Sequence, residues 1–474
     1  MFPRVVLGYK SAHEAQVQHH AFSALQPLGD NLMKLRQLAL AATMAAAGLT
    51  SAVVTTAATA AEQFFPALVY RTGAYAPNGA PFANGYIDYL KLTNVRGGIN
   101  GVKVSYEECE TGYATDRGVE CYERLKGKNG GATVFQPLST GITFALTEKA
   151  PKDEIPLITS GYGRSESADG GVFKWNFPLV GTYWTAVDVL IQHIGAKAGG
   201  MDKLKGKTIG LVYHDSPYGK EAIPMLEMRA AMHGFKALLL PVTHPGVEQK
   251  ATWLKVRRDR PDYVLLWGWG VMNSTAIKEA QATGYPREKM YGVWWSGAEP
   301  DVKDVAAGAK GYNALALQHG AEPNADVVKE VLSKLHGKGN GTGPQEEVGQ
   351  VLYMRGLVAA AMAVEGVRSA QVKYGNKVVT GAEMRWGLEN LDITEAQIKK
   401  IGLNGVMKPV STSCKDHMGA GAARVHTWDG TKWVFTSDWL EADMAIINPM
   451  VKAAADKYAA GKGLKRRPAS DCSS

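Results

Sequence analysis

The sequence has little cysteine, with 4 in 474 residues. That number excludes a fold built on a dense disulfide framework, although two bridges are possible. Excess charge is also small, because 53 Lys and Arg face 45 Asp and Glu for a net charge of +8. Non-specific binding of nucleic acid needs basic residues gathered on one face, so this balance predicts no nucleic-acid partner. The 53 glycines follow no period, which excludes collagen, and 45% hydrophobic residues are typical of a globular chain.

Motifs of catalytic sites are missing or incomplete. A phosphate-binding loop needs a Gly at position 201, but Met201 stands there, ahead of Gly206-Lys207-Thr208. The sequence has no dinucleotide GxGxxG after its first strand, and Ser296 lacks the upstream Gly of a nucleophile elbow. The Cys and His of residues 414–417 and the pair His214-Asp215 have no recognisable third partner. We therefore expect no catalytic residues, no metal and no cofactor.

A hydrophobic run long enough to span a membrane is also missing near the N-terminus. Residues 38–49 are rich in Ala, are interrupted by Thr43, and fall short of the roughly 20 apolar residues that a span needs. Lys34 and Arg36 precede this run, and small residues follow it up to position 61. This pattern predicts a cleaved secretory signal at residues 33–61, with residues 1–32 an over-called N-terminus. No Cys lies at the cleavage site, so we expect an exported protein without a lipid anchor.

Export makes disulfide bonds permissible for the four cysteines, which allow three pairings. Cys109 and Cys121 flank a short segment, and closing so local a loop is easy to place, so the spacing favours this pair. Cys414 and Cys472 remain as the second pair. Free buried thiols are the alternative.

Predicted strands and helices alternate in two series, which indicates an α/β fold of parallel sheets flanked by helices. The first series has strands at 66–70, 102–106, 132–135 and 155–158, with helices at 82–93, 115–125 and 142–149. The second has strands at 207–213, 237–242, 263–267 and 291–294, with helices at 183–196, 220–233, 249–258 and 273–283. The tail carries predicted helices at 345–367 and 381–391, then a hairpin at 425–435 with an Asp-Gly turn. Two such series predict two doubly wound lobes.

Ligands of open parallel sheets bind at the carboxyl ends of the strands, so the loops there are the candidate site. Ser139 and Thr140 begin a predicted helix, whose free N–H groups and hydroxyls can accept a carboxylate; a plain N-cap is the alternative. Ligand-binding candidates in other loops are Tyr75, Ser160, Gly161, Tyr162, Gly163, Tyr218 and Trp269. For Trp269 a place in the core and a place in a ligand wall are equally compatible with the sequence.

Four segments in this order carry a resemblance to a known family: residues 97–101, 139–141, 213–219 and 279–284. Over residues 64–440 the chain resembles the periplasmic solute-binding proteins of ABC importers, of the branched-chain amino acid-binding type. The resemblance implies a type I periplasmic binding protein fold, in which two lobes are joined by three hinge crossovers and close on a ligand. It also implies membrane permease subunits as partners, and we expect a monomer. We expect lobe I at 62–180 and 318–408, lobe II at 181–317 and 409–445, and a C-terminal helix and tail at 446–474.

The resemblance assigns roles to single residues. Ser139 and Thr140 match the loop that binds the ligand carboxylate, residues 160–163 match the second loop that holds the ligand, and Tyr218 matches the aromatic residue that covers it. Met272 stands where the amino acid binders have an acidic residue for the ligand's ammonium group.

This departure bears on the ligand, because a buried ammonium without an acidic partner costs several kcal/mol. Unless Asp215 substitutes, an α-amino acid is disfavoured, and we expect an acid with an apolar or aromatic body. A ligand-sensing receptor of the same fold is the alternative function. A secreted enzyme that uses His214 and Asp215 is a weaker one.

Overall fold

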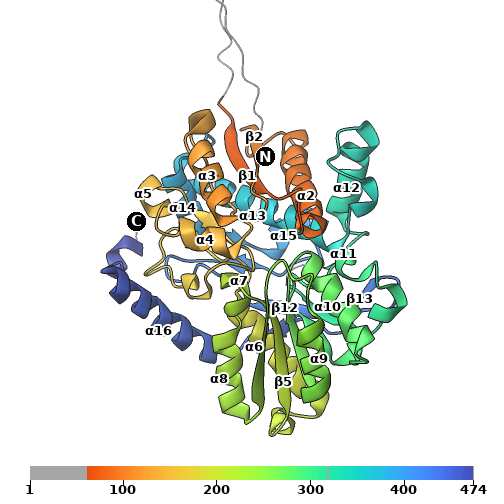
Figure 1. Ribbon diagram of the computed structural model, residues 1–474. Coiled ribbons are helices and arrows are strands. Elements are labelled where there is room, and N and C mark those ends of the chain that lie inside the picture. Colours follow the sequence, from red (N-terminus) through yellow and green to blue (C-terminus); the bar gives the residue numbers. More distant parts are fainter. Residues whose placement is uncertain (1–60, 318–319, 473–474) are drawn as a thin grey trace, which may run out of the picture. The chain divides into compact units, whose positions relative to one another are not determined.

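The computed structural model describes residues 61–317 and 320–472. The predicted over-called N-terminus and the predicted signal peptide up to residue 60 lie outside the described residues. Residues Ala61–Ser474 form one unit by their contacts, and within it Figure 1 shows two groups of strands and helices, here called the first and the second lobe. Within the described part of the chain, no helix is long and apolar enough to cross a membrane.

The sheet of the first lobe is parallel. Strand β1 (Gln63–Val69) pairs with β2 (Val104–Glu110), and β3 (Leu157–Ile158) pairs with β4 (Asn176–Phe177). The strand predicted at 132–135 is an extended segment between these pairs: the Thr133 N–H donates to the Phe64 carbonyl over 3.0 Å, and the Phe135 N–H donates to the Pro156 carbonyl over 3.0 Å. Of these four residues, only Phe135 forms a β-bridge, which pairs it with Leu157. The structure therefore has a single bridge where the sequence predicts a full strand.

Helices cover both faces of this sheet because β1 alternates its apolar side chains. Phe64 and Leu68 belong to the cluster around α3 (Thr115–Leu125), whereas Phe65 and Val69 belong to the main core with α2 (Ala76–Val95) and α13 (Val351–Tyr374). Successive strand residues point to opposite faces, and this places one apolar layer on each side. The shorter helices α4 (Thr140–Leu146) and α5 (Ala150–Asp153) follow α3.

The second lobe is built on a mixed sheet in the order β13-β12-β9-β8-β7-β5-β6, with β14 beside β12. Its parallel part consists of β5 (Thr208–His214), β6 (Lys236–Val242), β7 (Tyr263–Trp267), β8 (Met290–Gly292) and β9 (Asn313–Ala316). The antiparallel part consists of β12 (Ala422–Trp428), β13 (Trp433–Phe435) and β14 (Leu440–Glu441). The predicted hairpin is therefore present, but it adds an antiparallel edge to a lobe that was expected to be parallel.

Helices flank this second sheet on both faces. Figure 1 shows α6 (Tyr183–Ala198) and α8 (Ile223–His233) on one side, with α9 (Lys250–Asp259) and α10 (Val271–Ala282) on the other. The single-turn helices α7 (Pro217–Lys220) and α11 (Glu299–Val302) lie at the carboxyl ends of strands.

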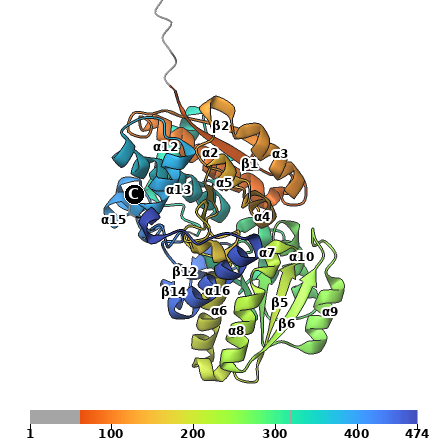
Figure 2. The ribbon, with the colours of Figure 1, turned by 90° about the vertical axis from the view of Figure 1, so that its left-hand side faces the viewer.

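The chain crosses between the lobes three times, as the type I periplasmic binding protein fold requires (Figure 2). It enters the second lobe between β4 and α6, and it returns after β9 to α12 (Asp326–Lys334), α13 and α14 (Gly381–Glu389). After the small ladder of β10 (Asp392–Ile393) with β11 (Val410–Ser411) and helix α15 (Glu395–Lys400), it enters the second lobe again at β12. The lobe boundaries given above stay a prediction.

Helix α13 differs in position from the helix predicted at 345–367. It begins at Val351 and ends at Tyr374. Gly349 at φ +93° interrupts the helical conformation after a short 3₁₀ turn, and Gly375 at φ +85° ends the helix. Both conformations are open to glycine without steric cost, and that explains the shift of the boundaries.

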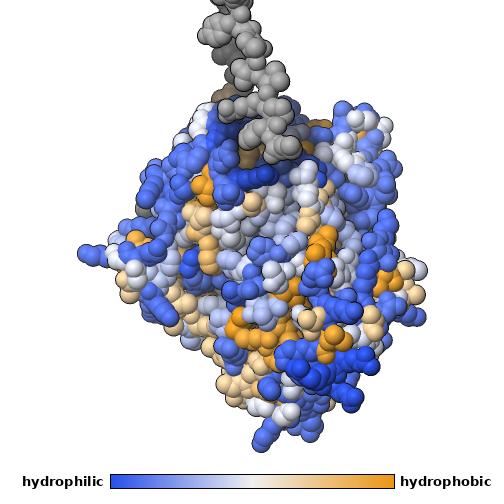
Figure 3. Space-filling model, in the orientation of Figure 1, coloured by the Kyte–Doolittle hydropathy of each residue, from blue (hydrophilic) through white to orange (hydrophobic). Residues whose placement is uncertain are grey.

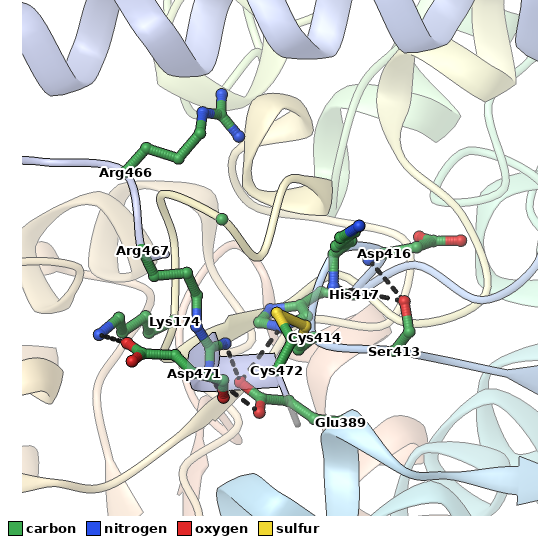
Figure 4. The surroundings of a disulfide bond; sticks show 12 residues. Lys174, Glu389, Ser413, Cys414, Asp416, His417, Arg466, Arg467, Asp471 and Cys472 are labelled. Atoms are coloured by element: carbon green, nitrogen blue, oxygen red, sulfur yellow. Dashed lines mark hydrogen bonds and ion pairs between the residues drawn. A yellow bond between two sulfur atoms is a disulfide. The ribbon is translucent and has the colours of Figure 1, made fainter. Parts of the chain in front are cut away.

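Two disulfide bonds join the cysteines in the pairing that the spacing favours. Cys109–Cys121 links β2 to α3, and Cys414–Cys472 ties the end of the chain to the loop before β12. Figure 4 shows the second bridge beside Glu389, which accepts a hydrogen bond from Arg467 Nη1 over 2.6 Å. Before this tail, α16 (Met444–Lys462) packs against the 3₁₀ segment Ser165–Ala168 of the first lobe. The C-terminal segment is therefore anchored at several points.

Exposed apolar side chains of the described residues come from separate elements, such as Val95 of α2, Leu254 of α9 and Val372 of α13. Figure 3 shows apolar patches interspersed among hydrophilic residues on one face of the molecule.

Candidate functional site

A cavity with a volume of about 20 Å³ lies where loops of both lobes meet. It is lined by Tyr70, Tyr113, Leu138, Ser139, Thr140, Tyr162, Tyr183, Tyr218, Trp269 and Trp295. Most of these residues follow the carboxyl ends of strands: Tyr70 after β1, Tyr113 after β2, Tyr162 after β3, Tyr218 after β5, Trp269 after β7 and Trp295 after β8. This is the place where open α/β sheets bind ligands.

The first lobe contributes the predicted hydroxyls. Ser139 caps α4, and its Oγ accepts a hydrogen bond from the Ile142 N–H over 3.3 Å. Thr140 Oγ1 accepts from the Gly163 N–H over 3.3 Å. Each hydroxyl therefore accepts a hydrogen bond within the protein, and each also interacts with a tyrosine of the cavity wall, Ser139 with Tyr113 and Thr140 with Tyr183. The structure brings both residues to the cavity wall, where the sequence expectation places them.

The loop at residues 160–163 lies behind this wall. Tyr162 lines the cavity, and its hydroxyl accepts from the Leu138 N–H over 2.8 Å. The Gly161 carbonyl accepts from the indole N–H groups of Trp294 and Trp295 over 2.8 and 3.0 Å. Gly161 and Gly163 thus act through their backbone groups, at φ +74° and +90°. Ser160 lines an adjoining void rather than this cavity.

The second lobe closes the cavity with aromatic residues. The Tyr218 hydroxyl donates to the Gly268 carbonyl over 2.9 Å, and Trp269 Nε1 donates to the Tyr70 hydroxyl of the first lobe over 3.1 Å. The indole N–H of Trp269 therefore finds its partner across the two lobes, as buried tryptophans usually do. Of the two interpretations of Trp269, the structure supports a place in the cavity wall.

Met272 does not line the cavity, in contrast to the sequence expectation. It is fully buried in the first turn of α10, where its side chain packs against Gly246 and Gly268. Asp215, the acid that could have substituted for it, forms an exposed ion pair with Lys220 over 2.8 Å and is also not part of the lining. The packing of α10 directs Met272 elsewhere, and Asp215 lies in the turn between β5 and α7.

Tyr75 is a neighbour of the site and not part of its lining. Its ring lies 4.4 Å from the ring of Tyr113, and its hydroxyl lies 2.8 Å from His214 Nε2 of the second lobe. His214 Nδ1 in turn lies 2.7 Å from Ser216 Oγ. Burial lowers the pKa of His214 to about 4, with a smaller contribution from nearby His244. His214 is therefore neutral at neutral pH and serves as a contact between the lobes.

The sequence expectation missed five lining residues: Tyr70, Tyr113, Leu138, Tyr183 and Trp295. Tyr70 and Tyr113 follow the first two strands, so an examination of every strand end for aromatic residues would have found them. Leu138 and Tyr113 also carry positive φ values of 51° and 64°. Such conformations are costly for bulky residues and concentrate at functional sites, but only coordinates reveal them.

The cavity is aromatic and uncharged. Burial raises the pKa of each tyrosine in its wall well above the ordinary value, so all remain neutral. None of the lining residues is acidic, and an ammonium group would therefore lack a partner there. Elsewhere in the described chain, no group of three or more His, Cys, Asp or Glu side chains is placed to hold a metal ion.

Comparisons with known proteins agree with this architecture. A solved structure described as an ABC transporter permease from the Pseudomonas fluorescens group is 42% identical, with a TM-score of 0.80, over 86% of this chain and 99% of that chain. A branched-chain amino acid ABC transporter from Thermus thermophilus with bound valine has 20% identity and a TM-score of 0.67, over 82% of this chain and 99% of the other. A solute-binding protein from R. palustris in complex with benzoate has 16% identity and a TM-score of 0.61, over 81% and 97%.

No curated protein sequence matches this chain significantly. The family model described as periplasmic binding protein matches residues 62–432, which is most of the chain. On this match, and on the two lobes that enclose a cavity at their strand ends, the chain belongs to the periplasmic binding protein family.

Proposed function

We propose that this protein is the periplasmic substrate-binding component of an ABC importer, and that it binds a small carboxylic acid with an apolar or aromatic body. The observation that carries the proposal is the cavity between the lobes, whose wall combines aromatic rings with the hydroxyls of Ser139 and Thr140. In the conformation described, the cavity has a volume of only about 20 Å³, far below the roughly 300–1,000 Å³ of small-molecule sites. A small solute therefore enters while the lobes are apart, and the lobes close on it.

Binding works by hinge closure in this proposal. Contacts across the lobes surround the cavity: Trp269 with Tyr70, Trp295 with Gly161, and Tyr75 with His214. A ligand that touches both walls adds its own contacts to the closed form and so shifts the equilibrium towards it. The closed protein then presents the surface that a membrane permease recognises, and the solute is delivered there.

The chemistry of the wall argues for an acid without an ammonium group. A buried ammonium needs an acidic partner, and the lining offers none. The aromatic rings suit a flat or apolar body, which gains from stacking as well as from burial. The solved relatives named above hold valine in one case and benzoate in another, so the fold accommodates both kinds of acid.

A ligand screen tests the proposal. Purified protein is unfolded and refolded to remove any co-purified ligand, and its melting temperature is measured with amino acids, amides, aromatic acids and short fatty acids. We expect aromatic or apolar monocarboxylic acids to raise the melting temperature and to bind with micromolar affinity by titration calorimetry. Micromolar binding of leucine without binding of any aromatic acid would contradict the proposed ligand class.

The same incubation separates binding from turnover. We expect the acid to be recovered intact after incubation with the protein, because no catalytic group lines the cavity. Conversion of the acid would favour a secreted enzyme. A permease gene and an ATPase gene beside this one would favour transport over a sensory receptor.

A further inference from the structure

Arg355, in the first turns of α13, is a buried cation whose guanidinium has no hydrogen-bond partner in the described part of the chain. Only 3% of its surface is exposed, and none of its three guanidinium nitrogens forms a hydrogen bond. Its guanidinium lies 4.4 Å from the ring of Trp295, a residue of the cavity wall. A buried charge of this kind is costly unless something of opposite charge compensates it.

The protein supplies only a counter-charge that does not touch the guanidinium. Asp301 is the acid that interacts electrostatically with Arg355, but none of the guanidinium nitrogens forms a hydrogen bond with it. The carboxylate of Asp301 instead accepts hydrogen bonds from Asn273, over 3.0 Å, and from the Ala298 N–H, over 2.9 Å. Burial lowers the pKa of Arg355 to about 9, so the guanidinium is still protonated at neutral pH.

Other deeply buried arginines of the chain are paired. Arg229 donates to Asp188, and Arg467 donates to Glu389 over 2.6 Å. The same fold thus neutralises buried guanidinium groups where their role is structural. Arg355 departs from this pattern beside the candidate site.

Arg355 faces a void that adjoins the cavity. The void has a volume of about 10 Å³, the space of about one water molecule. It is lined by Phe82, Ser160, Tyr162, Val180, Leu317, Arg355, Val358 and Ala359. Ser160 Oγ is also buried without a hydrogen-bond partner. Tyr162 lines both the void and the cavity, so the two spaces share a wall. A cation and a hydroxyl without partners therefore face one space next to the aromatic rings.

We propose that Arg355 and Ser160 form the anchor for the ligand's carboxylate, and that the aromatic cavity takes the uncharged body. This proposal rests on the proposed function and moves the carboxylate away from Ser139 and Thr140. The planar guanidinium fork donates two parallel hydrogen bonds to a carboxylate, and Ser160 donates a third. Ser139 and Thr140, which are neutral, then bind an uncharged polar group such as a phenol.

Charge balance defines the substrate class further. One carboxylate neutralises one guanidinium, whereas a second carboxylate would stay buried among neutral tyrosines without a cation. The site therefore selects monocarboxylic acids over dicarboxylic acids of similar size.

The test compares an acid with its uncharged analogue of the same shape. Benzoate and 4-hydroxycinnamate, and their primary amides, are titrated into the wild-type protein and into Arg355→Met, Ser160→Ala and Ser139→Ala. We expect wild type to prefer each acid over its amide by at least about 30-fold, and Arg355→Met to lose that preference. Ser160→Ala weakens acid binding selectively. Ser139→Ala weakens the binding of 4-hydroxycinnamate and of its amide alike, and it leaves benzoate and its amide unchanged.

Controls separate binding from folding. Arg368→Met removes a guanidinium from the same helix at a different site, where Arg368 contacts Glu365 and Asn100, and we expect it to bind like wild type. Without ligand, Arg355→Met melts at the same temperature as wild type or higher, because it removes an uncompensated buried charge.

An unchanged preference for the acid in Arg355→Met would overturn the anchor, as would a loss of the preference in Ser139→Ala alone. If wild type binds none of the acids in the wider screen, the proposed function fails and the anchor fails with it. If wild type binds the acids, and Arg355→Met binds them with an unchanged preference over the amides, only the anchor fails.

Discussion

Burial of a polar side chain without hydrogen bonds lowers the stability of the folded state, and the rest of the fold has to offset that loss. His426 of β12 is 1% exposed, neither ring nitrogen has a hydrogen-bond partner, and the ring stacks on Trp433 at 4.2 Å. Burial, with smaller contributions from the positive charges of Arg355 and Arg424, lowers the pKa of His426 to about 3. The residue thus behaves as a neutral aromatic ring at every physiological pH.

A pH-dependent loss of stability follows for this histidine. The unfolded chain takes up the proton near pH 6.5, whereas the folded chain takes it up only near pH 3, so this group destabilises the folded state as the pH falls below about 6.5. His426→Phe removes the effect. Between pH 7.5 and pH 5 we expect the variant to gain about 2 kcal/mol relative to wild type, measured by urea denaturation at both values. An equal difference at the two pH values would show that His426 does not titrate in this way.

At the scale of elements, the central contact of the first lobe is the crossing of α2 and α13. A Cβ atom on Gly85 of α2 would collide with the carbonyl oxygen of Tyr353, and one on Gly356 of α13 would collide with the carbonyl oxygen of Phe82. Glycine at both positions lets the two backbones approach closely. This contact also fixes the side from which Arg355, the neighbour of Gly356, reaches the void.

Gly356→Ala should therefore destabilise the protein although alanine is the better helix former. Overpacking of a well-packed contact typically costs 1–3 kcal/mol, and we expect a loss of about that size in the free energy of unfolding. Gly461→Ala is the matched control, because Gly461 lies in α16 with open space around its Cβ position. That change should be neutral or stabilise the protein by about 0.5–1 kcal/mol. Equal effects of the two substitutions would contradict the close crossing.

For the whole molecule, the Cys414–Cys472 bridge holds the C-terminal segment against both the loop before β12 and the first lobe. Its cysteines are 58 positions apart in sequence, against 12 for Cys109 and Cys121. A longer loop restricts the unfolded chain more, so the C-terminal bridge should contribute the larger share of stability.

Double serine variants test which of the two disulfide bridges contributes more to stability. We expect Cys414→Ser with Cys472→Ser to lower the free energy of unfolding by about 2–4 kcal/mol. Cys109→Ser with Cys121→Ser should cost less, measured by the same denaturation experiment under oxidising conditions. A smaller effect at the C-terminal bridge would mean that the tail detaches before the rest of the protein unfolds and that its bridge does not constrain the global transition.

Much of the fold and part of the site could be predicted from the sequence. The spacing of apolar residues along the sequence predicted both α3 and β7 at their observed bounds. This spacing shows which side of an element is buried. The strand-end rule found Ser139, Thr140, Tyr162, Tyr218 and Trp269, since parallel strands bring their carboxyl ends to one edge. It failed for Met272, whose direction depends on how the first turn of α10 packs.

The sequence by itself determined the two α/β series, the loops that carry the ligand-facing residues, and the resemblance to one family. Tertiary structure alone decided which residues far apart in the chain share a space. Ser160 lies in the first series and Arg355 in the tail, yet both line one void. A sequence pattern shows that a residue is buried but not what it is buried against, so the missing partner of Arg355 becomes visible only when the lobes are folded.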